Sequence, residues 1–289
     1  MYAITGITGK VGGVLARQLL AKGHAVRAIL RNAAKAHDWA ARGCQITLAS
    51  MEEPDQLASS FEGAEGVFIL PPSDFDPAPG YPEARRVIDA VTTALRRAKP
   101  KKTLCLSTIG ADAPHDNLLT QRTLMEQAVG QIDLPVTILR PGWFMENALW
   151  DVASARDEGA LHSFLQPADR PFPMVATQDI GSVAADLLLQ DWDGRRLFEL
   201  EGPARVSPND LAAAFAAALG RPVRVEIVPR ASWEALFTAQ GMKNPLPRMR
   251  MLDGFNEGWI EFADQGRSAL RGPTPLAEVI ARLVSTGTA

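Results

Sequence analysis

The chain has 289 residues, 46% of them hydrophobic and 22% charged, and its 30 basic and 33 acidic side chains give a formal net charge of −3. This composition is typical of a globular protein, and so balanced a charge argues against a dedicated nucleic-acid surface. No apolar run is long enough to cross a membrane, and Cys44 and Cys105 are too few for a disulfide framework or a zinc site. We therefore expect a cytoplasmic protein that has no metal centre and contacts neither membrane nor nucleic acid.

Short apolar runs alternate with longer amphipathic stretches from residue 2 to about residue 140. The runs that predict strands are residues 2–5, 25–30, 45–48, 66–70, 103–106 and 136–139. Between them, residues 12–22 and 81–98 place apolar side chains at helical spacing. Such alternation indicates repeated β-α units, so we predict an α/β fold whose centre is a Rossmann-like doubly wound parallel sheet.

The pattern changes after residue 141, where proline and glycine become frequent. Ser207-Pro208-Asn209-Asp210 supplies an N-cap, a first-turn proline and an acid, and so predicts a helix over residues 211–219 that ends at Gly220. Further strands are expected at residues 197–200 and 223–228, and a last helix is expected to open at Thr274-Pro275.

This change also divides the chain. We predict that residues 1–145 form the Rossmann domain and that part of residues 175–200 returns to it. Residues 146–289 are expected to form mainly a smaller C-terminal α/β lobe folded against that domain.

The strongest motif joins the first predicted strand to the first predicted helix and reads Thr5-Gly6-Ile7-Thr8-Gly9-Lys10-Val11-Gly12. A dinucleotide pyrophosphate must approach backbone N–H groups at a helix N-terminus, where side chains block the tight turn. Gly6 and Gly9 would give that access, and Gly12 would let the helix pack close to the sheet. The alternative is a glycine-rich turn that binds nothing, but the flanking strand and helix favour a dinucleotide site. The predicted contacts are Gly6, Thr8, Gly9, Lys10 and Val11.

The residue that follows the second predicted strand distinguishes the two nicotinamide dinucleotides. An acid there binds the ribose 2′-hydroxyl of NAD, whereas an arginine accepts the 2′-phosphate of NADP. The chain has Arg31 at this place, with Lys35 one turn on, so we predict NADP(H) as the cofactor; the alternative is that Arg31 is a solvated loop residue. Ligands of such sheets lie at the carboxyl ends of the strands. The further contacts predicted there are Ser50, Met51, Leu70, Pro71, Ser107 and Pro141.

Several segments together resemble one family. They are the glycine turn, residues 26–32, residues 138–147 with the distinctive run Arg140-Pro141-Gly142-Trp143-Phe144-Met145-Glu146-Asn147, and Thr274-Pro275-Leu276. On these segments the chain resembles the NmrA-like branch of atypical short-chain dehydrogenases/reductases over nearly its whole length. That resemblance implies an NADPH-dependent quinone, azo-dye or triphenylmethane-dye reductase, or a redox-sensing regulator that binds the dinucleotide without turning it over.

The wider superfamily protonates its substrate with a tyrosine assisted by a lysine four residues later, and neither stands in place here. The tyrosines are Tyr2 and Tyr81, and no lysine occurs between Lys102 and Lys243. Aligned on Glu126, Leu118 takes the tyrosine position and Arg122 the lysine position. Ordinary reversible oxidation of a secondary alcohol is therefore disfavoured.

Two candidates are left for catalytic contacts, Thr108 and Arg122. Arg122 carries a permanent charge and several donors, so it can also contact the cofactor ribose; the alternative is an arginine on a solvated helix face. Thr108 and Ser107 match the superfamily's serine at the end of the fifth strand, and the alternative is a polar strand end that caps the next turn.

Aromatic side chains follow the sixth strand and point to the kind of substrate. We predict that Trp143, Asn147 and Trp150, with Phe75 from the proline-rich loop, line a substrate cleft; the alternative is packing between the lobes. A conjugated or polarised acceptor such as a quinone, dye or iminium needs little acid catalysis. We therefore predict an NADPH-dependent reductase of a small aromatic or conjugated substrate. The alternatives are an NADP(H)-sensing regulatory protein and a natural-product tailoring reductase, and a homodimer is compatible with each.

Overall fold

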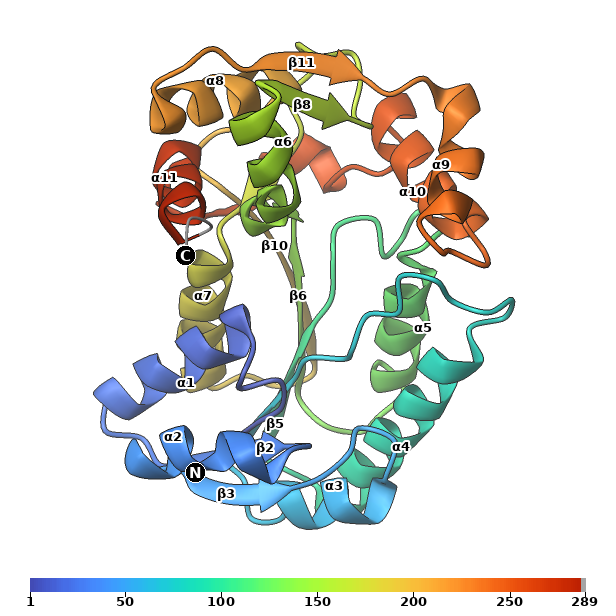
Figure 1. The fold of residues 1–289 in the computed structure, drawn as a ribbon. Coiled ribbons are helices and arrows are strands. Elements are labelled where there is room, and N and C mark those ends of the chain that lie inside the picture. Colours follow the sequence, from blue (N-terminus) through green and yellow to red (C-terminus); the bar gives the residue numbers. More distant parts are fainter. Residues whose placement is uncertain (287–289) are drawn as a thin grey trace.

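An eight-stranded sheet, parallel throughout, runs through the centre of the computed structural model, which describes residues 1–286 (Figure 1). Its spatial order is β12 (Leu270–Arg271), β10 (Arg195–Glu201), β6 (Val136–Pro141), β5 (Lys102–Leu106), β4 (Gly66–Ile69), β1 (Tyr2–Ile4), β2 (Val26–Leu30) and β3 (Gln45–Leu48). Two short parallel pairs lie outside it, β7 (Trp143–Phe144) with β9 (Met174–Val175) and β8 (Ala160–Ser163) with β11 (Arg224–Ile227). The strand order reverses between β1 and β4, which marks the switch point of a doubly wound sheet.

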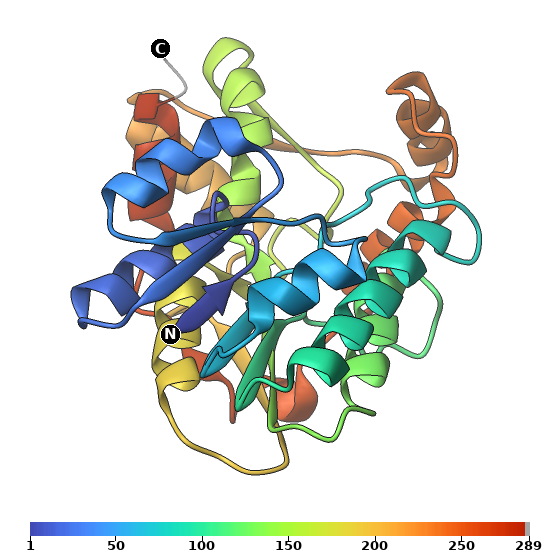
Figure 2. The same cartoon turned by 90° about the horizontal axis from the view of Figure 1, so that it is seen from below.

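Helices cover both faces of this sheet, which explains why its central strands β4 and β5 are buried along their whole length. α1 (Lys10–Ala21) and α7 (Thr177–Leu189) lie on one face; α3 (Pro54–Phe61), α4 (Pro82–Ala98) and α5 (Thr120–Val129) lie on the other (Figure 2). The other helices are α2 (Ala36–Ala41), α6 (Val152–Asp157), α8 (Pro208–Leu219), α9 (Trp233–Ala239), α10 (Leu246–Glu257) and α11 (Leu276–Thr286). Short 3-10 segments are η1 (Ala33–Lys35), η2 (Met145–Asp151), η3 (Arg230–Ser232) and η4 (Ala263–Gly266).

The helix α7 brings a late part of the chain back onto the first helix. A Cβ atom at Gly181 of α7 would lie 2.6 Å from the Cβ of Val14 and 2.7 Å from the carbonyl oxygen of Val11, both on α1. The two helices therefore touch at a position where only glycine fits, and β10 then follows α7 into the sheet.

A second core joins the elements of the C-terminal part. Phe215 of α8, Trp233 and Phe237 of α9 are fully buried in it. Ile109 and Leu118, from the segment after β5, are buried in the same core. The loop at the carboxyl end of β5 is therefore packed against the C-terminal elements.

The predicted fold class is confirmed. Every strand predicted in the first half of the chain occurs, and the capping box that opens α8 is formed between Ser207 and Asp210, with Gly220 at φ +66° after its end. The strands β7, β8, β9 and β12 were not predicted. β7, β9 and β12 have two residues each, too few to show a period of two, and β8 ends in two polar residues, His162 and Ser163. Within residues 1–286, no helix combines the length and apolarity that a membrane span requires. The division of the chain at residue 145 stays a prediction.

Candidate functional site

The glycine turn lies at the switch point of the sheet, between β1 and α1, and its backbone is crowded at Gly6 and Gly12. Gly6 has φ +62°, and a Cβ there would lie 2.8 Å from Cδ2 of Leu70. A Cβ at Gly12 would lie 2.5 Å from the Gly6 carbonyl oxygen, and one at Gly9 would lie 3.2 Å from the same atom. The expectation for Gly12 is thus corrected: its missing side chain lets α1 approach the turn itself, and not the sheet.

Thr5 connects this turn to the next strand. Its hydroxyl donates to the Phe68 carbonyl oxygen at 3.0 Å and accepts from the backbone N–H of Leu70 at 2.8 Å. These two bonds hold the carboxyl ends of β1 and β4 in register beyond the last strand pairing, at Ile4 and Phe68. Leu70 is thereby placed directly against Gly6.

The N-terminus of α1 is open toward the turn. Its N-cap residue is Gly9, so no N-cap side chain accepts a hydrogen bond from the first backbone N–H groups of α1. Thr8, Gly9 and Lys10 are exposed, whereas Val11 is buried beneath them. The first backbone N–H groups of a helix have no intrahelical acceptor and carry the positive end of the helix dipole, so this terminus can bind an anion.

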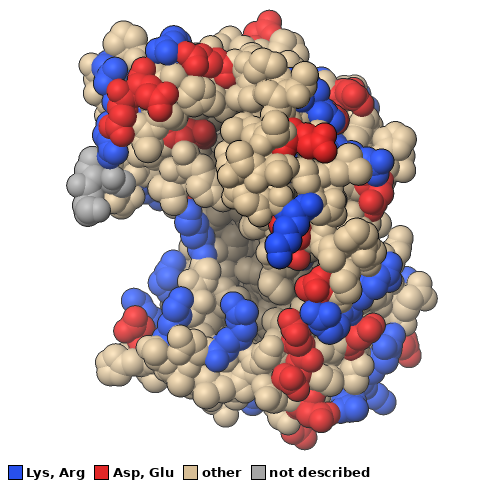
Figure 3. Space-filling view, turned by 45° about the vertical axis from the view of Figure 1, so that its right-hand side comes forward, with Lys and Arg blue, Asp and Glu red and all other residues tan. Residues whose placement is uncertain are grey.

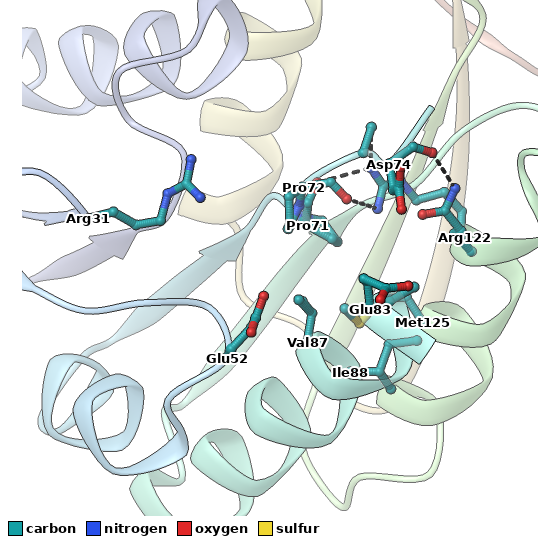
Figure 4. Close-up of a pocket in the computed structure, with 13 residues that line it drawn as sticks. Arg31, Glu52, Pro71, Pro72, Asp74, Glu83, Val87, Ile88, Arg122 and Met125 are labelled. Carbon is teal, nitrogen blue, oxygen red and sulfur yellow. Dashed lines mark hydrogen bonds between the residues drawn. The ribbon is translucent and has the colours of Figure 1, made fainter. Parts of the chain in front are cut away.

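A cavity of about 270 Å³ continues from the strand ends on the α4 side (Figure 4). Arg31 lies at one end of it and Arg122 at the other, with Pro71 between them. Ser50 is turned to local partners: its N–H donates to Gln56 and its hydroxyl accepts from Glu52 N–H, while Met51 packs against the core on the α4 face. The lining residues that the sequence did not single out are Glu52, Ser73, Asp74, Glu83, Ala84, Val87, Ile88, Gln121 and Met125.

Arg122 is bound to the segment that follows β4. Its guanidinium donates to the carbonyl oxygens of Pro71 and Pro72 at 2.9 and 3.2 Å and to the hydroxyl of Ser73 at 2.7 Å. All three partners are neutral, and burial lowers the pKa of Arg122 below its ordinary value. The guanidinium therefore holds a loop in place and brings an uncompensated positive charge to the wall of the cavity.

A charged network that the sequence did not predict lies beside the predicted residue Ser107. The Ser107 hydroxyl donates to Glu126, which also accepts from Arg140 at 2.9 and 2.6 Å. Asp112 accepts from the same guanidinium at 2.6 Å. Burial alone would lower the pKa of Arg140, but the hydrogen bonds and charges of Glu126 and Asp112 raise it instead. The Ser107 hydroxyl is thus engaged as a donor to Glu126. The neighbouring Thr108 is half-buried at the same strand end.

Neither tyrosine can replace the missing phenol. Tyr81 precedes α4 at φ +58° and its hydroxyl contacts Asp116 and the Asn117 carbonyl oxygen, each at 2.9 Å. Burial, together with Asp116, raises the pKa of Tyr81 to about 12. Burial, together with Glu65, raises the pKa of Tyr2 to about 12 as well. Leu118, at the position aligned with the family tyrosine, is buried.

The residues predicted to line the substrate cleft fall into two groups. Phe75 and Trp150 are exposed and lie in edge-to-face contact, with ring centroids 6.4 Å apart. Trp143 is half-buried and packs edge-on against Phe255 at 5.2 Å, and Asn147 is half-buried. Pro141 is buried, and its carbonyl oxygen accepts from Ile109 N–H. The structure therefore brings two of the predicted aromatic residues together and packs the third against the C-terminal core.

We expect Gly12→Ala to lower the free energy of unfolding by about 1–2 kcal/mol, since overpacking against the Gly6 carbonyl costs more than the roughly 1 kcal/mol that alanine gains in helix propensity. Urea unfolding measures this. Arg17→Ala, exposed on the same helix, is the control and should change stability by less than about 0.5 kcal/mol. Equal midpoints for Gly12→Ala and the parent chain would contradict the geometry.

Glu126→Gln should lower the free energy of unfolding by about 2–4 kcal/mol, because it leaves the charge of Arg140 paired only with a half-exposed partner. The matched variant Asp112→Asn should cost less than about 1 kcal/mol, because the Asp112 side chain is 57% exposed whereas that of Glu126 is 12% exposed. Thermal or urea unfolding compares the two, and equal losses would show that burial does not set the strength of this network.

Comparison with known proteins agrees with this geometry. A family model described as NAD(P)H-binding matches residues 6–191. An NAD(P)H azoreductase of Xenophilus azovorans is 29% identical over 85% of this chain and 83% of its own length. Quinone oxidoreductase 2 of Escherichia coli K12 is 27% identical over 98% of both chains. A solved NADPH complex of the E. coli quinone oxidoreductase QOR2 superimposes with a TM-score of 0.80 at 25% identity, covering 98% of this chain and 99% of that one. The predicted resemblance to NmrA-like atypical short-chain dehydrogenases/reductases is confirmed, and the chain belongs to the NAD(P)H-binding family.

Proposed function

We propose that the protein is an NADPH-dependent reductase that transfers hydride to a small conjugated or polarised acceptor such as a quinone or dye. The observation that carries the proposal is the open α1 N-terminus above a glycine turn in which a Cβ at Gly6 or Gly12 would have no room. The similarity to proteins named as azo-dye and quinone reductases supports the kind of acceptor.

In this proposal the pyrophosphate lies on the turn at Gly6, Thr8, Gly9, Lys10 and Val11. The adenosine half extends past Ser50 and Met51 into the cavity, with Arg31 at the 2′-phosphate. In Figure 3, Lys and Arg side chains lie to the left of the hollow and below it, whereas Asp and Glu side chains lie on its right; the basic side favours the anionic dinucleotide. The nicotinamide half turns toward Leu70, Pro71, Ser107, Thr108 and Pro141, at the ends of β4, β5 and β6.

NADPH, when bound, supplies a hydride from its nicotinamide ring. The chain's part is to hold the flat acceptor against that ring and to exclude water. In this proposal Thr108 donates a hydrogen bond to the acceptor, because the hydroxyl of its neighbour Ser107 donates to Glu126 instead. Arg122 acts through the loop carbonyls that it binds, and its positive charge stabilises the electron-rich product.

A cytoplasmic location belongs to the same proposal. Cys44 and Cys105 are both free and buried, as they would be in a reducing compartment. A homodimer stays a prediction.

Purified protein should oxidise NADPH when it is given quinones, azo dyes or triphenylmethane dyes, which the loss of NADPH absorbance measures. Titration by NADPH fluorescence runs in parallel as the control for binding. Binding without oxidation above background with every acceptor would contradict the reductase and favour a dinucleotide-sensing protein.

Arg31→Ala should lower kcat/KM for NADPH by about 10- to 100-fold, which corresponds to the loss of a charged hydrogen bond to the 2′-phosphate. For NADH, which lacks this phosphate, the change should stay within about twofold. Lys35→Ala, exposed in η1, is the matched control and should lose less than Arg31→Ala does. An equal loss of kcat/KM with NADPH and with NADH would show that Arg31 does not bind the 2′-phosphate.

A further inference from the structure

The segment after β4, residues 71–80, here called the strap, is fixed on the side of α5. Arg122 donates to the Pro71 carbonyl oxygen at 2.9 Å, and Gln121 Nε2 donates to the Asp74 carbonyl oxygen at 2.8 Å. Both anchors are side chains of the same helix. The strap is therefore tied to the Rossmann sheet up to the residue before Phe75.

The residue after Phe75 ties the strap to the other part of the chain. The Asp76 carboxylate accepts from the backbone N–H groups of Lys243 and Asn244, at 2.8 and 2.7 Å. Asn244 Nδ2 returns a bond of 2.8 Å to the Pro77 carbonyl oxygen. The backbone bonds from Lys243 and Asn244 lower the pKa of Asp76, so the carboxylate is charged at neutral pH.

Between these two anchors the ring of Phe75 stands free of the core. It is 55% exposed, and its partner Trp150 is 66% exposed. Phe75 follows the end of β4 by a few residues, and Trp150 follows β7 in η2. Both rings thus extend from segments that leave the strand ends where the nicotinamide half is proposed to lie. They meet edge to face, with an interplanar angle of 87°.

We propose that Phe75 and Trp150 form an aromatic clamp for one ring of a multi-ring flat acceptor, and that Asp76 is the positioning residue that fixes its Phe75 side. The inference rests on the proposed reductase function and narrows its substrate class to acceptors with fused or linked aromatic rings. One ring of such an acceptor lies in the clamp while another reaches the nicotinamide.

The distance between the two rings fits this role. A flat molecule between two parallel rings needs centroids about 7 Å apart, twice the optimal carbon–carbon separation of about 3.5 Å. The observed centroids are 6.4 Å apart. Rotation of one exposed side chain and a small opening therefore convert the edge contact into a slot. The edge contact between Phe75 and Trp150 is then replaced by two face contacts with the acceptor ring. A single-ring acceptor that lies at the nicotinamide cannot make these contacts.

The test compares kcat/KM for phenanthrenequinone, which has fused rings, with kcat/KM for p-benzoquinone, which has one. In Phe75→Ala and in Trp150→Ala, the ratio of kcat/KM for phenanthrenequinone to kcat/KM for p-benzoquinone should fall by about 3- to 10-fold, the range of one aromatic pair. The fall should come from a higher KM for phenanthrenequinone and not from a lower kcat. The double variant should fall no further, because either ring alone makes no slot. Phe75→Tyr, which keeps the ring, should stay within about twofold of the parent ratio.

Asp76→Ala tests the positioning role. It should lower the ratio in the same direction, and it should add nothing in a Phe75→Ala background. NADPH affinity, measured by fluorescence, should stay unchanged in both. Leu197→Ala removes an exposed large side chain on β10 and should leave the ratio at the parent value.

The outcomes separate the clamp from the reductase. If the parent protein oxidises NADPH with neither these quinones nor the azo and triphenylmethane dyes, the proposed function fails and the clamp fails with it. If it reduces dyes but not phenanthrenequinone, the reductase stands and the clamp fails. If it reduces both quinones, an unchanged ratio in the alanine variants, or a loss in Phe75→Tyr equal to that in Phe75→Ala, overturns the clamp alone.

Discussion

The hydroxyl of Thr5 is the contact on which the rest of the site depends. It joins the carboxyl ends of β1 and β4 through one donated and one accepted hydrogen bond, and so sets Leu70 against Gly6. On one side of this junction the crowded turn leads into the open end of α1. On the other side the same strand end continues into the strap. The proposed cofactor cradle and the start of the strap therefore meet at the buried hydroxyl of Thr5, while Gln121, Arg122 and Asp76 hold the rest of the strap.

Chemistry at the end of β5 is shaped by charge pairing. Ser107 follows the end of β5, and its hydroxyl donates to Glu126, which also accepts from Arg140. The Ser107 hydroxyl proton is therefore engaged in that contact. With both tyrosines held at high pKa in other contacts, the site is better suited to acceptors that spread negative charge over a conjugated system than to carbonyls that need an acid.

The sequence predicts those parts whose signal is local. The glycine spacing, the alternation of strands and helices and the capping box at Ser207 each depend on neighbouring residues, and the structure contains all three. The network of Ser107, Asp112, Glu126 and Arg140 has no such signal, because its members come from different elements and share no spacing. The role of Asp76 is still harder to predict from the sequence. Its partners are backbone N–H groups, which every residue except proline carries, so no side chain marks them in the sequence.

The bond between Asp76 and the backbone at Lys243 and Asn244 spans most of the chain, and this has a consequence for the order of assembly. The turn, Thr5 and Leu70 can reach their final arrangement once the first strands pair, because closing a short loop costs less entropy than closing a long one. The part of the strap at Asp76 can gain its anchor only after Lys243 and Asn244 have been synthesised. During synthesis, the dinucleotide side therefore matures first, and the side that faces the acceptor is completed only when nearly the whole polypeptide is present.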